Sequence, residues 1–305
     1  MKFSPFLLCA VFTCTTASTT TANPIIVSDD AQATITLPRP AKRIATLAPF
    51  LTELVYAAGA QTSLVGVSAF SDYPSAAATL PVVADYQGVA MESLLALKPD
   101  LVLAWQTGNR PQDITRIQAL GIPVMQFELK TLADIGRAMT QIALISGVSE
   151  LSSAAKKFEI GVANLKANYS NPAVRKVRYF LPIERMPLMT LSGEHIVSNA
   201  LALCGGENIF AAAKVLAPVV DKEGVVARNP EIIFVSARNL KEIGSTAVLA
   251  PVGGGLEGLP VAAIKNNRVY GLNPDWLMRP TPRMLGAVES ACAAIQLVRT
   301  GAVTK

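Results

Sequence analysis

The sequence predicts an α/β protein made of two Rossmann-like lobes, each with a central parallel sheet, joined by one long α-helix. Three observations favour this fold class: an internal repeat, an alternation of apolar strand-like runs with predicted helices, and a long amphipathic stretch between the halves. Alternating strands and helices are typical of a parallel sheet covered by helices.

The internal repeat consists of residues 92–105 and residues 223–236. Each copy opens with an acid, Glu92 or Glu223, continues through a short apolar-periodic turn and reaches a proline. Proline ends a helix because it lacks the amide hydrogen and crowds the preceding turn. An unbroken apolar run follows, as expected for a strand buried on both faces of a sheet. The repeat therefore predicts two similar halves with their opening acids at equivalent corners.

The first 22 residues are typical of a secretory signal, with Lys2, a short apolar core and a small-residue tail that ends at Ala22. The apolar core is shorter than the ~20 residues that cross a bilayer, and no later stretch is long enough. We therefore predict export, cleavage after Ala22 (residues 1–22 removed) and no membrane insertion. A lipid anchor on Cys9 or Cys14 is the alternative.

The first half is expected to form an N-terminal lobe over residues 23–147. Apolar and polar residues alternate in 23–40, which indicates a leading hairpin or an edge strand. Glycines act as stop signals after the predicted helices. Outside the repeat, the expected strands are 43–47, 64–67, 82–83 and 122–127, and the expected helices are 51–58, 109–120 and 132–145.

A single predicted helix, residues 149–169, lies between the halves. Its apolar residues recur at spacings of four and three, so one face carries an apolar stripe. The stripe consists of Leu151, Ala155, Phe158, Val162, Leu165 and Tyr169. At ~1.5 Å per residue the helix spans roughly 30 Å, about the width of a small domain. We interpret residues 148–171 as a rigid bridge; an ordinary surface helix is the alternative.

The second half is expected to form a C-terminal lobe over residues 172–305. Outside the repeat, we expect strands at 176–181 and 269–272 and helices at 196–203 and 282–298.

Two cysteines remain after removal of the signal, Cys204 and Cys292. An even pair in an exported protein indicates a disulfide, which here would join two helices of one lobe. Two buried free thiols are the alternative.

Composition excludes some classes of function. Of the 305 residues, 51% are hydrophobic and 16% are charged, which suits a large core and not a disordered chain. Lys and Arg are scattered and the net charge is only +5, so no nucleic-acid footprint is present.

A catalytic apparatus is hard to assemble from this sequence. His195 is the single histidine, so a His-built metal site is not expected, and we interpret it as a loop or surface residue. Residues 253–258 formally match G-x-G-x-x-G, but Pro260 follows and no helix opens there, so an ordinary loop is expected. The sequence predicts a protein that is not an enzyme; an exported α/β enzyme is the alternative from another class.

Aromatic residues lie where a ligand is expected. Only 6% of residues are aromatic, yet several follow predicted strands. In open α/β sheets, the ligand crevice lies beyond the carboxyl ends of the strands. Two lobes with aromatic rims make a cleft that suits a large, flat, partly apolar ligand. The aromatic residues are Tyr73, Tyr86, Trp105 and Trp276, with Asp275 and Arg279 beside the last.

Several motifs together resemble one known family. In the first half they are Ser71-Asp72-Tyr73-Pro74, Gln87-Gly88, residues 96–102, and Ala104-Trp105 with Gly108-Asn109. In the second half they are Ser192-Gly193, residues 204–210, and Asp275-Trp276 with Arg279 and Pro282-Arg283. Over nearly its whole mature length, the chain resembles the periplasmic substrate-binding proteins of cobalamin importers, which belong to class III. The cysteine–glycine run and the Asp-Trp run are the most specific motifs.

The resemblance implies two lobes bridged by one helix, a periplasmic location, and a corrinoid carried as ligand with no resident cofactor. It also implies a monomer that docks on an ABC permease dimer with its ATPase subunits. By motif matching, the ligand would contact Pro49, Tyr73, Tyr86, Gln87, Trp105, Asp275, Trp276 and Arg279. The family's disulfide falls on Cys204 and Cys292.

Glu92 and Glu223 match the two transporter-docking acids of that family. A permease dimer has two equivalent faces, so a pseudo-symmetric pair of carboxylates can meet arginines on both. The alternative is that each is an ordinary acid at a helix N-terminus, which the helix dipole favours by ~0.3–1 kcal/mol.

The chain departs from the family pattern at several expected pocket walls. Tyr86 and the segment Leu216-Ala217-Pro218 stand where tryptophans are expected, and Leu188-Met189 stands near an expected phenylalanine. Phe50-Leu51 is bulkier than its counterpart. A truncated corrinoid such as cobinamide is therefore a second candidate ligand. Haem, with Tyr73 or His195 as axial ligand, and a ferric siderophore are further candidate ligands. A regulatory or scaffold binding module is a further candidate role.

Overall fold

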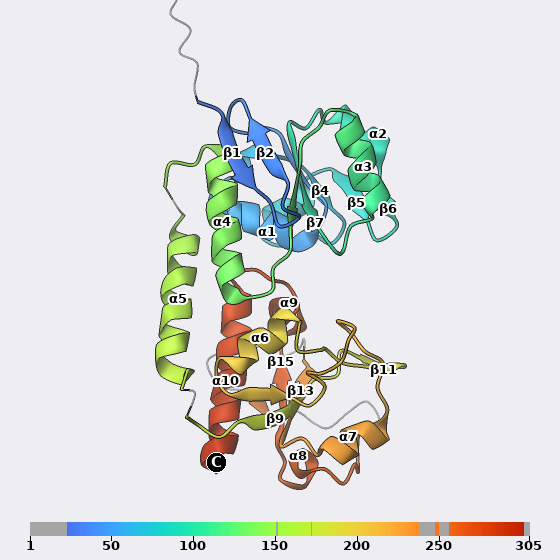
Figure 1. Ribbon diagram of the computed structural model, residues 1–305, viewed down its shortest axis with the longest axis vertical. Coiled ribbons are helices and arrows are strands. Elements are labelled where there is room, and N and C mark those ends of the chain that lie inside the picture. Colours follow the sequence, from blue (N-terminus) through green and yellow to red (C-terminus); the bar gives the residue numbers. More distant parts are fainter. Residues whose placement is uncertain (1–22, 151, 172, 238–247, 250–255, 302–305) are drawn as a thin grey trace, which may run out of the picture.

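The computed structural model describes residues 23–150, 152–171, 173–237, 248–249 and 256–301. The predicted signal, Leu151 and residues 253–255 of the glycine-rich match lie outside these ranges. Figure 1 shows two α/β lobes stacked along the long axis, with one helix running beside both. The fold class predicted from the sequence is therefore confirmed.

The N-terminal lobe is built on a six-stranded sheet in the order β6-β5-β4-β3-β7-β8. Its strands are β3 (Ile44–Thr46), β4 (Leu64–Ser68), β5 (Val82–Asp85), β6 (Gly88–Val89), β7 (Leu101–Trp105) and β8 (Val124–Phe127). Its helices are α1 (Pro49–Ala58), α2 (Met91–Ala96), α3 (Pro111–Ala119) and α4 (Leu132–Ser146), with short 3₁₀ turns at Gln61–Ser63 and Ser75–Thr79. Among the described strands of this sheet, all pairings are parallel except β5–β6 at the edge, which agrees with the predicted central parallel sheet.

The predicted leading hairpin is confirmed as β1 (Ile25–Ser28) paired antiparallel with β2 (Thr34–Leu37). Local signals explain the ends of the long helices in this lobe. Gly59 ends α1 at a positive φ of 84°, where a residue with a Cβ would be strained. Thr131 and Asp134 form a capping box at the start of α4.

The C-terminal lobe is built on a five-stranded sheet in the order β12-β9-β13-β15-β14. Its strands are β9 (Val177–Phe180), β12 (Gly206–Asn208), β13 (Ile232–Ser236), β14 (Val248–Leu249) and β15 (Val269–Leu272), with a separate hairpin of β10 (Glu184–Arg185) and β11 (Leu188–Met189). Its helices are α6 (Ile196–Ala202), α7 (Lys222–Arg228), α8 (Ala262–Lys265), α9 (Pro274–Leu277) and α10 (Met284–Thr300). Among the strands of this sheet that the structure describes, only β14 pairs antiparallel.

The repeat predicted from the sequence has the same backbone geometry in both lobes. The helix of each copy, α2 or α7, is followed by a residue in the left-handed region, Lys98 with φ 45° and Asn229 with φ 44°. The next residue is the proline, Pro99 or Pro230, whose ring disfavours helical geometry before it. The buried strand, β7 or β13, then begins.

The second acid of each repeat caps the neighbouring strand in the same way. Asp100 accepts hydrogen bonds from the backbone N–H groups of Lys42 and Arg43, both at 2.9 Å, just before β3. Glu231 accepts one from the backbone N–H of Arg178 at 3.2 Å, at the start of β9. The internal repeat is therefore a repeat of structure, including its side-chain contacts.

The helix between the lobes, α5, spans Ser153–Tyr169 and is shorter than the predicted 149–169, because Ser152 caps it by accepting the N–H of Ala155. It packs against α1 and α4 of one lobe and α10 of the other. Part of its predicted stripe, Ala155, Phe158 and Leu165, is buried. One hydrophobic core, which includes residues of both lobes and of α5, runs through this region. The exact limits of the lobes stay a prediction.

The predicted disulfide between Cys204 and Cys292 is present, with a Cα–Cα distance of 5.4 Å. It joins the segment that follows α6 to α10, and both cysteines are buried. Among the helices that the structure describes, none combines the length and the apolar character needed to cross a bilayer.

Candidate functional site

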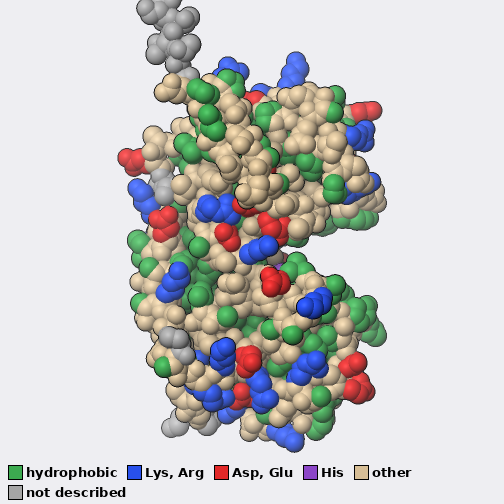
Figure 2. All heavy atoms as spheres, in the orientation of Figure 1, with side chains coloured by type: hydrophobic (Ala, Val, Ile, Leu, Met, Phe, Trp, Pro, Cys, Tyr) green, Lys and Arg blue, Asp and Glu red, His purple; other side chains and the backbone are tan. Residues whose placement is uncertain are grey.

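A cleft separates the two lobes on the side away from α5, and Figure 2 shows the molecule hollowed there. A cavity of about 730 Å³ lies between the lobes. The N-terminal lobe contributes Pro49, Phe50, Trp105, Thr107, Glu128 and Lys130, among others. The C-terminal lobe contributes Ser192, Glu194, His195, Lys214, Leu216, Met278 and Arg279, among others. The cavity is within the size range of small-molecule and cofactor sites, and its walls combine apolar surface with a few polar groups.

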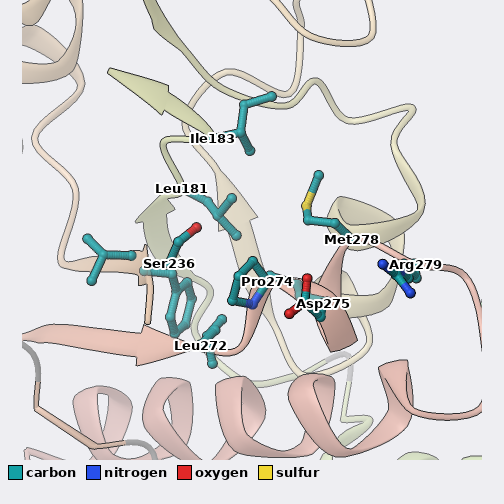
Figure 3. A pocket seen from close by; sticks show the side chains of 11 residues that line it. Leu181, Ile183, Ser236, Leu272, Pro274, Asp275, Met278 and Arg279 are labelled. Carbon is teal, nitrogen blue, oxygen red and sulfur yellow. The ribbon is translucent and has the colours of Figure 1, made fainter. Parts of the chain in front are cut away.

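A second cavity of about 600 Å³ lies in the C-terminal lobe, beyond the carboxyl ends of β9, β13 and β15. Figure 3 shows Leu181, Ile183 and Met278 around it, with Asp275 and Arg279 along its border. Met278 and Arg279 also line the inter-lobe cavity, so the two spaces meet at these side chains. Together they offer room for a ligand larger than either cavity alone.

Trp105, at the end of β7, is held in place by its own loop. The side-chain oxygen of Asn109 accepts the N–H of Trp105 at 2.7 Å, and its amide donates to the carbonyl of Leu47 at 2.9 Å. A Cβ on Gly108 would overlap the Trp105 ring, so only glycine fits there. The ring of Phe50 meets the Trp105 ring edge-on, at 5.8 Å and 88°. These contacts present a fixed aromatic wall to the cavity.

Charged side chains link the lobes beside the cavity. Glu53 of α1 is 2% exposed and accepts hydrogen bonds from Arg279 at 3.1 Å and from Nε of Arg283 at 3.0 Å. Arg279 also donates to Asp72 at 2.5 Å, and the Arg283 guanidinium lies 3.9 Å from the centre of the Tyr73 ring. Two arginines of the C-terminal lobe therefore form ion pairs with two acids of the N-terminal lobe and a cation–π contact with a tyrosine of that lobe.

This network shifts the pKa values of its members. The hydrogen bond from Arg279 is the main reason why the pKa of Asp72 is lowered, although partial burial opposes it. Burial acts to lower the pKa of Arg279, but hydrogen bonds to Asp72 and Glu53 outweigh it and raise that pKa. Both groups therefore stay charged throughout the physiological pH range.

A chain of buried hydroxyl groups fixes the loop that carries Asp72 and Tyr73. Thr46 bonds to Thr52 at 2.7 Å, Thr52 to Ser71 at 3.0 Å, and Ser71 to Ser68 at 3.2 Å. The four hydroxyls satisfy one another, so the loop is anchored to β3, α1 and β4 at once.

The structure brings together some of the residues predicted to contact a ligand. Pro49, Trp105 and Arg279 line the inter-lobe cavity, and Asp275 lines the second cavity with Arg279. Both cavities therefore draw on residues that the sequence had singled out.

The other predicted contacts lie outside these two cavities. Tyr73 is 46% exposed beside the charged network, and Tyr86 is 85% exposed. Gln87 borders a separate depression of about 400 Å³ on the N-terminal lobe. Trp276 is partly buried, with its ring against Gly286 of α10. The roles of these four residues in binding stay predictions.

His195 lies in the loop before α6, as expected from the sequence, and its side chain is largely buried there. It caps α6, where its Nδ1 accepts the backbone N–H of Val197 at 3.2 Å, and it lines the inter-lobe cavity. Burial lowers the pKa of His195 to about 4. Nothing in its sequence neighbourhood signals this position.

Glu53 was also missed, although the sequence carried a signal. The acid lies inside the apolar run Leu51–Val55 of a predicted core helix, and a buried carboxylate needs a charged or hydrogen-bonding partner.

Glu92 and Glu223 are both exposed in the first turns of α2 and α7. Figure 1 shows these helices at the outer parts of the two lobes, on the side away from α5. Neither carboxylate forms an ion pair or hydrogen bond with another described residue. Both are therefore available to a partner.

Among the described residues, no group of three or more His, Cys, Asp and Glu side chains is arranged to hold a metal ion.

Known proteins resemble this chain in sequence and in structure. The model of the family described as periplasmic binding protein matches residues 44–276. A vitamin B12-binding protein of Vibrio parahaemolyticus is 37% identical over 261 residues, which cover 85% of this chain and 91% of that protein. A vitamin B12-binding protein of Yersinia pestis is 38% identical over 268 residues, which cover 87% of this chain and 91% of that protein.

Among solved structures, the periplasmic vitamin B12-binding protein BtuF of Vibrio cholerae matches with a TM-score of 0.72 and 34% identity, covering 86% of this chain and 99% of that one. The periplasmic haem-binding protein HutB of Vibrio cholerae matches with a TM-score of 0.61 and 20% identity, covering 86% of this chain and 99% of that one. The second likeness concerns the fold alone.

Proposed function

The chain belongs to the periplasmic binding protein family, and we propose that it captures cobalamin or a related corrinoid between its lobes and delivers it to an ABC importer. The proposal rests on the inter-lobe cavity of about 730 Å³, which has an aromatic wall on one side and polar groups on the other. The relatives named vitamin B12-binding proteins, at 34–38% identity, support this choice of ligand.

The chemistry of a corrinoid fits these walls. A corrin ring is broad and flat, with apolar faces and with amide groups around its edge. Trp105, Phe50 and Pro49 supply apolar surface for the faces. Polar groups of the facing lobe, such as Arg279 and His195, supply hydrogen bonds for the edge. Leu216 lines the cavity in the segment where the family pattern leads us to expect a tryptophan, so less aromatic surface meets the ligand there.

Calorimetric titration of the mature protein with cyanocobalamin, dicyanocobinamide and hemin tests the proposal. We expect one-to-one binding of cyanocobalamin. Binding of dicyanocobinamide alone would keep the corrinoid class and narrow the ligand, because the nucleotide loop would then have no place in the site. Binding of hemin alone would overturn the corrinoid proposal.

Haem is a further candidate, and one contact weighs against His195 as its axial ligand. An axial ligand is needed, and Tyr73 and His195 are the residues that the sequence offers. The Nδ1 of His195 accepts the N–H of Val197, so the proton of the neutral ring lies on Nε2 and no lone pair is left there for iron. Arg283 lies over the ring face of Tyr73, a contact that does not occupy the phenolic oxygen. The hemin titration therefore doubles as a test of these contacts.

For delivery, we propose that Glu92 and Glu223 dock on the two halves of a permease dimer. Their exposure, their equivalent positions in the repeat and their freedom from ion pairs with other described residues support this role. A pair of carboxylates related by approximate symmetry suits a partner with two equivalent faces.

We also propose that residues 1–22 are removed on export, so that the mature protein begins at Asn23 and acts as a monomer in the periplasm. Mass spectrometry of the secreted protein gives its N-terminal residue. A mature chain that begins elsewhere, or carries a lipid on Cys9 or Cys14, would contradict the cleavage site.

A further inference from the structure

The turn before α6, residues Ser192–His195, forms part of the wall of the inter-lobe cavity. The turn is fixed by backbone contacts: the N–H of Ser192 donates to Leu216 at 2.9 Å and the N–H of Gly193 donates to Ala211 at 3.1 Å. A Cβ on Gly193 would lie 2.8 Å from the Ala211 carbonyl oxygen, so the turn lies close against that segment. Its side chains therefore have defined positions.

The hydrogen bond to Nδ1 determines what His195 can offer the cavity. A neutral imidazole has one nitrogen that accepts and one that carries the proton. Nδ1 accepts the N–H of Val197, so the proton lies on Nε2. Burial lowers the pKa of His195 to about 4, which keeps the ring uncharged at neutral pH. Among the described residues, no group accepts a hydrogen bond from Nε2.

Other charged groups border the same cavity without pairing with His195. They are Glu128, Lys130, Glu194, Lys214 and Arg279. Glu128 accepts hydrogen bonds from the backbone and hydroxyl of Thr107, and Arg279 pairs with acids of the facing lobe. The pKa of His195 is therefore lowered by burial and not by a neighbouring charge.

Ser192 provides a second free donor in the same turn. Its side chain is fully buried, and its Oγ has no hydrogen-bond partner among the described residues. Buried polar groups are rarely left unpaired, and a hydroxyl can rotate to donate. Two neutral donors without acceptors among the described residues thus occur three residues apart, in a turn that lines one cavity.

We propose that this turn binds the edge of the ligand. His195, through Nε2–H, and Ser192, through its hydroxyl, donate hydrogen bonds to neutral oxygen acceptors of the ligand. His195 is not a ligand of the corrinoid metal. The inference rests on the proposed function and adds which chemical group of the ligand the turn recognises. Uncharged donors suit the amide carbonyls around a corrin. The carboxylates of haem would be matched better by cations.

One substitution separates the two roles of His195. In H195N, the asparagine Oδ1 can still accept the N–H of Val197, since asparagine is among the best N-cap residues, but no donor remains at the Nε2 position. S192A removes only the hydroxyl. We expect H195N to weaken binding of cyanocobalamin about three- to tenfold, the size of one lost hydrogen bond, and S192A to weaken it by a smaller factor. Melting temperatures close to that of the wild type would confirm that both variants fold.

Calorimetry on the wild type and both variants, with the visible spectrum of bound diaquocobinamide, tests the inference. Diaquocobinamide has exchangeable axial positions, so imidazole bound to cobalt would shift its bands in the wild type and not in H195N. Equal spectra and weaker binding by H195N support the donor role. A band shift lost in H195N, or an unchanged affinity in that variant, would overturn it. A wild type that binds no corrinoid overturns the proposed function, and this inference with it.

Discussion

In the N-terminal lobe, α2 is followed by Lys98, whose backbone is left-handed, and then by the acid Asp100. In the C-terminal lobe, α7 is followed in the same way by left-handed Asn229 and then by Glu231. Both acids cap a neighbouring strand. At the carboxyl ends of the strands the lobes diverge: one presents the aromatic pair Trp105 and Phe50, and the other presents His195, Lys214 and Arg279.

This difference separates the features suited to docking from the features suited to ligand binding. Features shared by the lobes, such as the acids that open the repeat, suit a partner with two equivalent faces. Features that differ, the strand-end loops, suit a ligand whose two sides are unlike. The repeat thus accounts for the shared framework of the lobes and positions the acids proposed for docking, while the loops line the proposed ligand site.

The largest expected effect concerns docking. E92A combined with E223A should abolish corrinoid uptake while the affinity of the isolated protein for ligand stays unchanged, because both carboxylates lie far out on α2 and α7. If the lobes are equivalent toward the partner, each single variant should reduce uptake to a similar degree. Uptake assays in cells and calorimetry on purified variants measure the two properties. Weakened binding with surviving uptake would contradict the docking role.

The disulfide is a feature of the C-terminal lobe, and its removal should reveal an asymmetry in stability. It closes a loop of 88 residues, so C204S combined with C292S should lower the free energy of unfolding by up to ~4–5 kcal/mol. Urea unfolding measures the loss. Hydrogen exchange should rise more in β9 and β13 than in β3 and β7. Equal increases in both sheets would mean that the lobes unfold only together.

The contact between the lobes depends on a buried carboxylate. In E53Q, the guanidinium groups of Arg279 and Arg283 lose a charged partner that is 2% exposed, so unfolding should become easier by ~3 kcal/mol or more. D72N is the matched control: Asp72 pairs with the same arginine but is 66% exposed, and its loss should matter by less than ~1 kcal/mol. Similar losses in both variants, measured by urea unfolding, would contradict the importance of burial.

The single histidine makes the C-terminal lobe sensitive to acid. The pKa of His195 is about 4 in the folded protein and 6.5 ordinarily, so the unfolded chain binds the extra proton between these values. Stability from this group is complete above about pH 6.5 and is lost as the pH falls toward 4, by up to roughly 3 kcal/mol. The unfolding free energy of the wild type should fall relative to that of H195N as the pH drops from 7 to 4, because asparagine does not titrate in this range. A constant difference would show that the ring is not buried as described.

The smallest expected effect compares the two left-handed residues. Asparagine tolerates this region better than lysine, so K98N should stabilise the protein by ~0.5 kcal/mol. N229K should destabilise it by more, ~1–2 kcal/mol, because the side chain of Asn229 also accepts the N–H of Ala262 at 2.7 Å. Thermal unfolding measures both. A destabilising K98N or a stabilising N229K would refute the equivalence of the two repeats.

Sequence patterns were sufficient for elements with strong local signals. Proline and glycine stops, together with unbroken apolar runs, located both copies of the repeat and most helices. The strand Gly206–Asn208 was missed because it has no apolar residue, and the four-residue helix Pro274–Leu277 because it is too short to show periodicity.

Site residues were predictable from the sequence only where the end of a strand determines the position of the side chain. Trp105 follows a predicted strand directly, and it does line the cavity. Trp276 lies in the short α9, whose orientation depends on packing against α10, and no sequence pattern encodes that contact. His195 is placed by the turn before α6, which is held by backbone hydrogen bonds to Ala211 and Leu216.

The core that runs through α5 bears on how a ligand leaves. A protein with a loose hinge releases its ligand by opening on its own. Here, separation of the lobes would expose the apolar face of α5 and break the contacts of Glu53 with two arginines. We therefore expect the two lobes to separate rarely without an outside partner. Because α2 and α7 lie at the outer parts of the two lobes, on the side away from α5, a transporter bound to both helices would act at a distance from the contact between the lobes.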